Sequence, residues 1–175
     1  RPLMSNYNKP EGIDVSLAHA PLTASSGHPM GIRKLYLDRG YFDGLFNSLA
    51  EIEFHGYVTI RSEEDLESKW DSILSFSPDF IKLNLLYSEE YSVRKDDTRY
   101  FGKKGLNPKL IPTIVKKAHA HGLRVSAHVE TANDFHVAVH AGVDEIAHLP
   151  EIKNGKPIQK ADVIMAKEKN LVVVT

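Results

Sequence analysis

The chain has 175 residues, a length that suits one domain or part of a larger one. Hydrophobic residues make up 42% and charged residues 26%, which is typical of a globular protein and excludes a disordered chain. The formal net charge is −1, so we expect no nucleic acid as a partner. No apolar run approaches the roughly 18 residues that span a bilayer. We therefore expect no membrane partner, and no signal-peptide pattern assigns a compartment.

Two residue types narrow the chemistry. The absence of cysteine excludes disulfides, a thiol nucleophile and a zinc–thiolate site. Nine histidines are the one surplus in the composition, and histidine is the residue of metal binding and acid–base chemistry near neutral pH. The sequence therefore directs the search for a site to its imidazoles.

The segment before Ser62 carries the weaker structural signals. Ile13 to His19 and Gly56 to Ile60 have the composition of strands, and Ser25 to Gly31 has that of a loop. The chain ends in the β-branched run Leu171 to Thr175, which suits a buried strand, with nothing after it to cover that strand. We therefore expect an internal piece of a longer protein, whose open sheet edges would favour oligomers.

From Ser62 onward, helix and strand signals alternate. The predicted helices run from Ser62 to the stop at Ser77-Pro78, from Asn107 to Gly122, from Thr131 to Gly142 and from Ile158 to Lys169. The predicted strands are Asp79 to Leu86, Arg124 to Val129, Val143 to His148 and Leu171 to Thr175. The segment from Tyr87 to Leu106 is predicted to be a polar, charged loop. This alternation predicts a parallel sheet with right-handed crossovers, whose active site would lie at the carboxyl ends of the strands.

Three residues occupy such strand-end positions. Lys82 interrupts an apolar strand, and His128 and His148 lie near the ends of the two strands that follow. The histidines are twenty residues apart, about one strand–helix unit, so equivalent strand ends would present both imidazoles together. Two such histidines suit one metal ion, although a hydrogen-bonded core histidine is the ordinary alternative for either. The side chain of Lys82 either faces the same side of the sheet as these two histidines or points outward and extends its amine to water.

The remaining histidines and the loop charges are weaker candidates. His119 and His121 have metal-site spacing, but side chains two apart on a helix diverge. His136 and His140 are spaced to chelate a metal, yet they lie off the apolar face, so we expect solvent exposure. His28, in the glycine-flanked loop, is a candidate substrate contact. The loop residues Glu89, Glu90 and Glu130 read as solvated carboxylates, and the cations Arg94, Lys95 and Arg99 read as solvated or as contacts for a substrate carboxylate.

An ordered set of short blocks resembles the metal-dependent amidohydrolase superfamily, in particular its imidazolonepropionase-like group and related peptidases. The blocks are Ser26-Gly27-His28-Pro29, Phe80-Ile81-Lys82-Leu83, Ala118-His119-Ala120-His121-Gly122, Val125-Ser126-Ala127-His128, Ala141-Gly142-Val143-Asp144-Glu145-Ile146-Ala147-His148 and Val173-Val174-Thr175.

The resemblance implies that residues 1–175 form part of a (β/α)8 barrel of the TIM type with one or two divalent metal ions, most commonly zinc. Lys82, His128 and His148 match the metal ligands of strands 4, 5 and 6, and Lys82 matches a lysine that is carbamylated in many members. The His-x-His of strand 1 and the general-base Asp of strand 8 would lie outside this chain. The implied activity is hydrolysis of a carbon–nitrogen bond in a small amide, cyclic amide or peptide through a metal-activated water.

Two alternatives stay open. Asp79-Phe80-Ile81-Lys82 also resembles the lysine strand of Schiff-base aldolases, a reading that explains Lys82 but neither His128 nor His148. The other alternative is a partial barrel without independent activity, because only three of the five ligand-bearing strands can be matched here.

Overall fold

A six-stranded, entirely parallel sheet forms the centre of the protein, which we describe from a computed structural model covering residues 8–9, 11–151 and 156–174. The strands lie in the order β2-β1-β3-β4-β5-β6. Their bounds are β1 Leu22–Thr23, β2 Val58–Thr59, β3 Phe80–Asn84, β4 Arg124–His128, β5 Glu145–Ile146 and β6 Val172–Val173.

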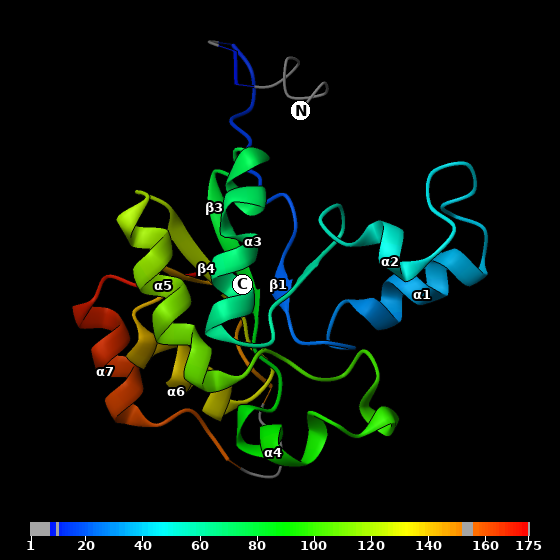
Figure 1. Cartoon of the computed structure of the whole chain (residues 1–175). Helices are drawn as coiled ribbons and strands as arrows, with labels where there is room; N and C mark the ends of the chain where they lie inside the picture. Colours follow the sequence, from blue (N-terminus) through cyan, green and yellow to red (C-terminus); the bar gives the residue numbers. More distant parts are fainter. Residues whose placement is uncertain (1–7, 10, 152–155, 175) are drawn as a thin grey trace.

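The helices α3, α5, α6 and α7 form a layer over one face of this sheet, and α1 and α2 lie beside its β1–β2 end (Figure 1). The α-helices are α1 Met30–Asp38, α2 Leu49–Ile52, α3 Glu63–Ser75, α4 Tyr91–Arg94, α5 Ile111–Ala120, α6 Ala132–Ala141 and α7 Lys160–Glu168. Single 3₁₀ turns occur at η2 Ser88–Glu90, η3 Thr98–Tyr100 and η4 Pro108–Leu110.

Local capping explains why the helix predictions after Ser62 are confirmed. The Ser62 side chain accepts a hydrogen bond from the Asp65 amide at the start of α3. Thr131 and Asp134 form a reciprocal capping box at the start of α6. Gly142 ends α6 in the left-handed conformation at φ 84°, which glycine adopts without steric cost.

Alternation along the strands separates a helix-covered face from an inner face. In β3 the residues Ile81 and Leu83 are buried in the main core with Val125 and Ala127 of β4. Trp70 from α3 joins them, with further apolar side chains of α5, α6 and α7. Lys82 and its register partner Ser126 therefore lie on the opposite face, which would line a barrel interior.

The parallel α/β organisation is confirmed, but the described residues form an open sheet and no closed barrel. The order of the strands in the sheet departs from their order in the sequence at β1. This strand lies between β2, which forms the edge of the sheet, and β3. The helices α1 and α2, which connect β1 to β2, lie to the side of the sheet rather than over its face (Figure 1). This connection therefore differs from the later ones, whose helices cover the sheet.

The predicted strand from Ile13 to His19 is wrong. At Leu17 this segment is tied to the residue before β3, because the Leu17 amide donates to the Asp79 carboxylate and the Leu17 carbonyl accepts from the Asp79 amide. Ile13 is 75% exposed, and His19 turns the chain at φ 64° before β1 begins at Leu22. The apolar residues of this segment do not pair with a neighbouring strand in the described part of the chain, so the segment does not form a strand.

Among the described residues, the last strand lies uncovered at an open edge of the sheet, as we expected for a run with nothing after it to cover it. Val172, Val173 and Val174 are 49%, 37% and 47% exposed. They form the edge strand β6, which pairs with β5 alone in the described part of the chain. Across the same described ranges, no helix is long and apolar enough to cross a membrane.

Candidate metal centre at the strand ends

His128 and His148 meet where β4 and β5 end. The His128 carbonyl accepts from the Leu85 amide at 2.9 Å, which ties the end of β4 to the end of β3. The Nε2 atom of His148 lies 2.6 Å from Nδ1 of His128, and the two ring planes are inclined by 77°. Two imidazoles that are twenty positions apart in the sequence are thus in direct contact.

The path of the chain to His148 differs from the prediction. We expected a strand continuing to His148, but β5 ends at Ile146. After the Ala147 amide donates to the Ala127 carbonyl at 2.9 Å, the chain bends and His148 leaves the strand alternation. This bend allows His148 to reach His128, although Ile146, two residues earlier, faces the helix layer.

His128 has a buried nitrogen without a hydrogen-bond partner. Its side chain is 16% exposed, and its Nε2 atom makes no hydrogen bond within the described part of the chain. The carboxylate of Glu130 lies 3.7 Å from that nitrogen. Burial, followed by the nearby charges of His148 and His28, lowers the pKa of His128 to about 4. His128 is therefore neutral at physiological pH, the state in which an imidazole binds metal.

His28 is the third imidazole of this cluster. It stacks on His128 with ring centroids 4.9 Å apart and planes 11° from parallel. The loop is held by the His28 amide, which donates to the Lys104 carbonyl at 2.9 Å, and by Asn84, whose side-chain amide donates to the His28 carbonyl at 3.0 Å. A Cβ on Gly27 would come within 2.6 Å of that Lys104 oxygen, so this close approach requires glycine.

Lys82 is half-buried on the inner face, beside Ser126 in the register of β3 and β4. Burial lowers the pKa of its amine, against the opposing attraction of Glu145. Across the described residues, Lys82 makes no hydrogen bond or ion pair, while Glu145 accepts from the Ser126 hydroxyl at 2.8 Å. A lysine so placed is shifted toward the neutral amine, the form that reacts with carbon dioxide or a carbonyl.

Two carboxylates at this site were missed from the sequence. We expected Glu130 to be a solvated loop residue, and this is wrong because its side chain is only 23% exposed beside His128. Glu145 was not singled out, yet it lies on the inner face next to Ser126. The signal for Glu130 was its position two residues after His128, since alternate residues share one side of an extended chain.

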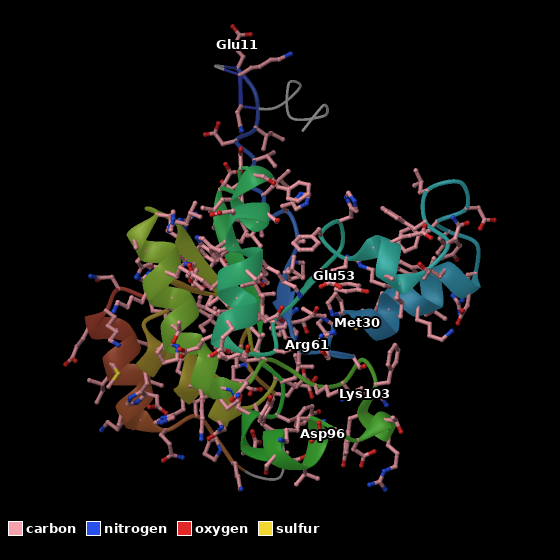
Figure 2. All side chains as sticks on the ribbon, in the orientation of Figure 1. Glu11, Met30, Glu53, Arg61, Asp96 and Lys103 are labelled. Atoms are coloured by element: carbon pink, nitrogen blue, oxygen red, sulfur yellow. The ribbon has the colours of Figure 1, made fainter. Side chains whose placement is uncertain are left out.

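A cavity of about 540 Å³ adjoins the cluster. Its lining includes His28, His128 and Glu130 together with Arg94, Arg99 and Lys103 from the loop that follows β3. Lys103 lies on this loop below α1 in Figure 2.

The arginine side chains of this loop differ in how exposed they are and in how firmly their contacts hold them. Arg94 is 11% exposed, with its Nε atom 2.7 Å from the Glu90 carboxylate and its guanidinium over the Tyr87 ring. Arg99 is 83% exposed and contacts only its neighbour Asp97 by hydrogen bonding. Arg99 and Lys103 are therefore better placed than Arg94 to turn toward an anionic group in the cavity.

His119 and His121 do not contribute to this centre. The Nε2 atom of His119 lies 2.9 Å from the Asp144 carboxylate, while Nδ1 of His121 lies 2.9 Å from the Lys117 carbonyl. The two rings therefore have separate partners near the end of α5. His136 and His140 lie on α6, in the helix layer.

Fold and site together define a parallel α/β unit with an imidazole cluster at the carboxyl ends of its strands. No protein-family model matches the chain, and no curated protein matches it. Solved structures do. Ochratoxinase from A. niger superposes with a TM-score of 0.62 at 19% identity, over 93% of this chain and 35% of that one. A Xaa-Pro dipeptidase with methionine bound in its active site gives 0.60 at 15% identity, over 99% and 37%.

A structure described as an amidohydrolase gives a TM-score of 0.50 at 22% identity, over 69% of this chain and 26% of that one. These likenesses show that the chain shares its fold with a part of each of these three structures. The chain spans about a third of the length of the ochratoxinase and of the Xaa-Pro dipeptidase. The imidazolonepropionase-like group is not represented among these three, so that finer placement stays a prediction.

Proposed function

We propose that this chain carries the metal-binding part of a hydrolase that cleaves carbon–nitrogen bonds, with His128, His148 and Lys82 as ligands. The observation that carries the proposal is the buried Nε2 atom of His128, which has no hydrogen-bond partner and belongs to a neutral ring in contact with His148. Buried polar atoms are rarely left unpaired, and an unpaired one calls for an explanation such as an ion.

The donor set fits one or two divalent ions, of which zinc is the best match. Two neutral imidazoles are typical zinc donors. A carbamylated Lys82 would add an anionic oxygen, and burial prepares its amine for that modification. In the family resemblance, the remaining ligands and the general-base Asp come from strands 1 and 8, which this chain does not supply.

When bound, a divalent metal lowers the pKa of a coordinated water and polarises the carbonyl to be cleaved. The residues of this chain then position the substrate. The stacked ring of His28 and the Glu130 carboxylate flank His128 and narrow the approach to it. Arg99 and Lys103, which line the same cavity, provide positive charge for a substrate carboxylate.

This arrangement favours a small acyl-amino acid or dipeptide as the substrate class. In such molecules a carboxylate lies a few bonds from the scissile amide, which matches a cavity lined by both imidazoles and cations. The structural likeness to a Xaa-Pro dipeptidase supports the same class.

The experiment is metal analysis and hydrolysis by the full-length protein, measured on acyl-amino acids and dipeptides with their amide-blocked counterparts. We expect bound zinc in the wild type and its loss, with hydrolysis, in His128→Asn. His119→Gln is the matched control, because that imidazole is already paired with Asp144. Full metal content and turnover in His128→Asn would overturn the assignment.

A Schiff-base reaction at Lys82 is the second candidate, and the lowered pKa of the lysine favours it independently of the histidines. Borohydride reduction distinguishes the aldolase reaction from the hydrolase reaction. Reduction in the presence of a carbonyl substrate would fix an imine to Lys82 in an aldolase, whereas the hydrolase predicts no such adduct.

A further inference from the structure

We propose that His136, His140 and Asp162 form a separate site for a divalent transition-metal ion, which links helices α6 and α7. No step of the proposed hydrolysis uses these residues. The site stands on its own geometry, and its occupancy does not depend on the strand-end centre.

The three side chains converge between the two helices. Nδ1 of His136 lies 2.9 Å from the Oδ1 atom of Asp162, and Nε2 of His140 lies 3.2 Å from the same oxygen. The two rings are 4.1 Å apart between centroids, as their four-residue spacing on α6 dictates. One ligand atom from each residue lies within 4.8 Å of the other two, so small side-chain rotations would bring all three onto one ion.

Asp162 supplies the second observation that points to a ligand. Its side chain is 3% exposed, and its Oδ2 atom is buried without a hydrogen-bond partner in the described ranges. A buried carboxylate oxygen left without a donor is unfavourable. A cation held by both imidazoles and this carboxylate would balance the buried negative charge that the unpaired oxygen leaves.

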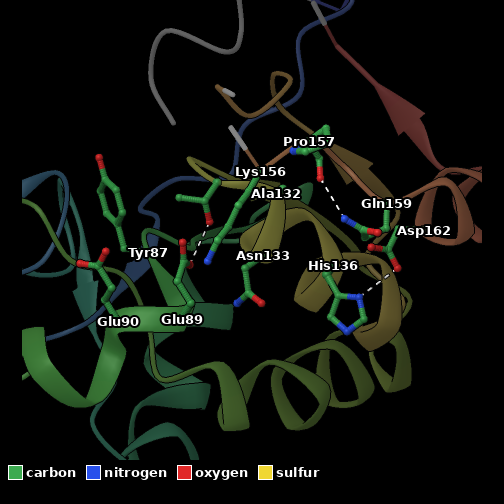
Figure 3. A pocket seen from close by; sticks show the side chains of 11 residues that line it. Tyr87, Glu89, Glu90, Ala132, Asn133, His136, Lys156, Pro157, Gln159 and Asp162 are labelled. Carbon is green, nitrogen blue, oxygen red and sulfur yellow. Dashed lines mark hydrogen bonds and ion pairs between the residues drawn. The ribbon is translucent and has the colours of Figure 1, made fainter. Parts of the chain in front are cut away.

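The donors select the kind of ion. Two imidazoles and one carboxylate suit Zn²⁺ and neighbouring transition metals, whereas Mg²⁺ and Ca²⁺ prefer oxygen donors. Three protein donors leave a coordination position for water. His136 and Asp162 line a pocket whose volume is about 450 Å³. Figure 3 shows them with Asn133 from α6 and Glu89 from η2, which also line it. The free position would open toward this pocket.

The site has a structural consequence. α7 buries only Asp162 and Ala166, yet it leads the chain into the edge strand β6. A metal link between α6 and α7 would therefore strengthen the attachment of the last described helix and strand. Lys169 makes one other polar link between these elements, from its amine to the Val139 carbonyl at 2.9 Å.

The test is zinc titration of full-length protein by calorimetry, with cobalt absorption as a second probe and thermal unfolding as a third readout. We expect His140→Gln to lower the number of bound zinc ions by one and to weaken binding at this site by more than the roughly 10- to 100-fold that loss of an outer-shell partner costs. His136→Gln should do the same. Both side chains are about half exposed, so neither change should prevent folding.

Two further variants locate the ion. The double variant His128→Asn with His148→Asn should keep one zinc ion, and zinc should still raise its unfolding temperature. His119→Gln, an exposed histidine that also faces a carboxylate, should change nothing. If His140→Gln binds as many ions as the wild type, with the same affinities and thermal shift, the group is only a histidine–aspartate ion-pair cluster and the proposal is wrong.

Discussion

The two histidine clusters of this protein are built in opposite ways. The strand-end cluster draws His28, His128 and His148 from three distant segments, and its central ring is largely buried with one nitrogen unpaired. The helix-layer cluster takes His136 and His140 from one helix, and both half-exposed rings already contact the Asp162 carboxylate.

This difference separates two reasons for binding a cation. At the strand ends, neutral imidazoles are held in place by the sheet, so a metal needs no rearrangement of the backbone. In the helix layer, the buried carboxylate supplies negative charge while exposed rings supply the remaining donors. We therefore expect tighter binding at the strand ends and a larger stabilising role between the helices. The following predictions test that contrast.

The largest effect should come from His128→Asn. It removes the most buried ligand, so zinc affinity at the strand ends should fall by more than the roughly 100-fold seen for outer-shell changes. Competition with a chelator measures this affinity. The helix-layer site should keep its zinc, and equal weakening of both sites would contradict their independence.

Asp134→Ala should produce the next largest effect, on stability rather than on a single site. The buried Asp134 carboxylate accepts from the amides of Tyr87, Ser88, Glu130 and Thr131, and from the Ser88 hydroxyl, so it joins the loops after β3 and β4. Leaving several buried donors unpaired should reduce the free energy of unfolding by about 3 kcal/mol. Urea unfolding measures it, and a loss below about 1 kcal/mol would show that water replaces the carboxylate.

Lys82→Met should act on the strand-end centre alone. The change keeps the apolar stem and removes the amine, so it should reduce strand-end metal content while leaving the unfolding free energy and the helix-layer site unchanged. Labelling the wild type with carbon-13 bicarbonate should give a carbamate signal that Lys82→Met lacks. An identical signal in both proteins would place the carbamate elsewhere.

Glu53→Gln should have the smallest effect and serves as a control outside both clusters. Burial raises the pKa of Glu53, but hydrogen bonds from Thr59 and Lys69 outweigh it, so the net pKa is lowered. A lowered carboxyl pKa stabilises the fold above the ordinary value of 4.5, and this stability is lost as pH falls. The variant should be about 1 kcal/mol less stable at pH 7, and urea unfolding should show this difference shrinking as the pH falls below 4.5.

What the sequence predicted well depends on neighbours in the chain. The caps at Ser62 and Thr131 and the stop at Gly142 are local signals, and all three are observed. Lys82 lies in register with Ser126 on the face opposite the buried core, which is one of the two placements that the sequence left open.

What the sequence did not reveal depends on contacts between distant segments. The failure of Ile13 to His19 to form a strand reflects the lack of a partner, which no local pattern encodes. Asp162 could not be linked to His136 because the contact exists only when α7 packs on α6. Similarly, His148 reaches His128 through a bend after β5 that alternation does not predict.

The most direct test of the central claim is anomalous X-ray diffraction at the zinc absorption edge, from crystals of the full-length protein grown with zinc. Our account predicts a peak within bonding distance of both His128 and His148, at about 2.0–2.1 Å from their ring nitrogens. A well-ordered strand-end cluster without such a peak, while zinc is bound elsewhere in the same crystal, would contradict it.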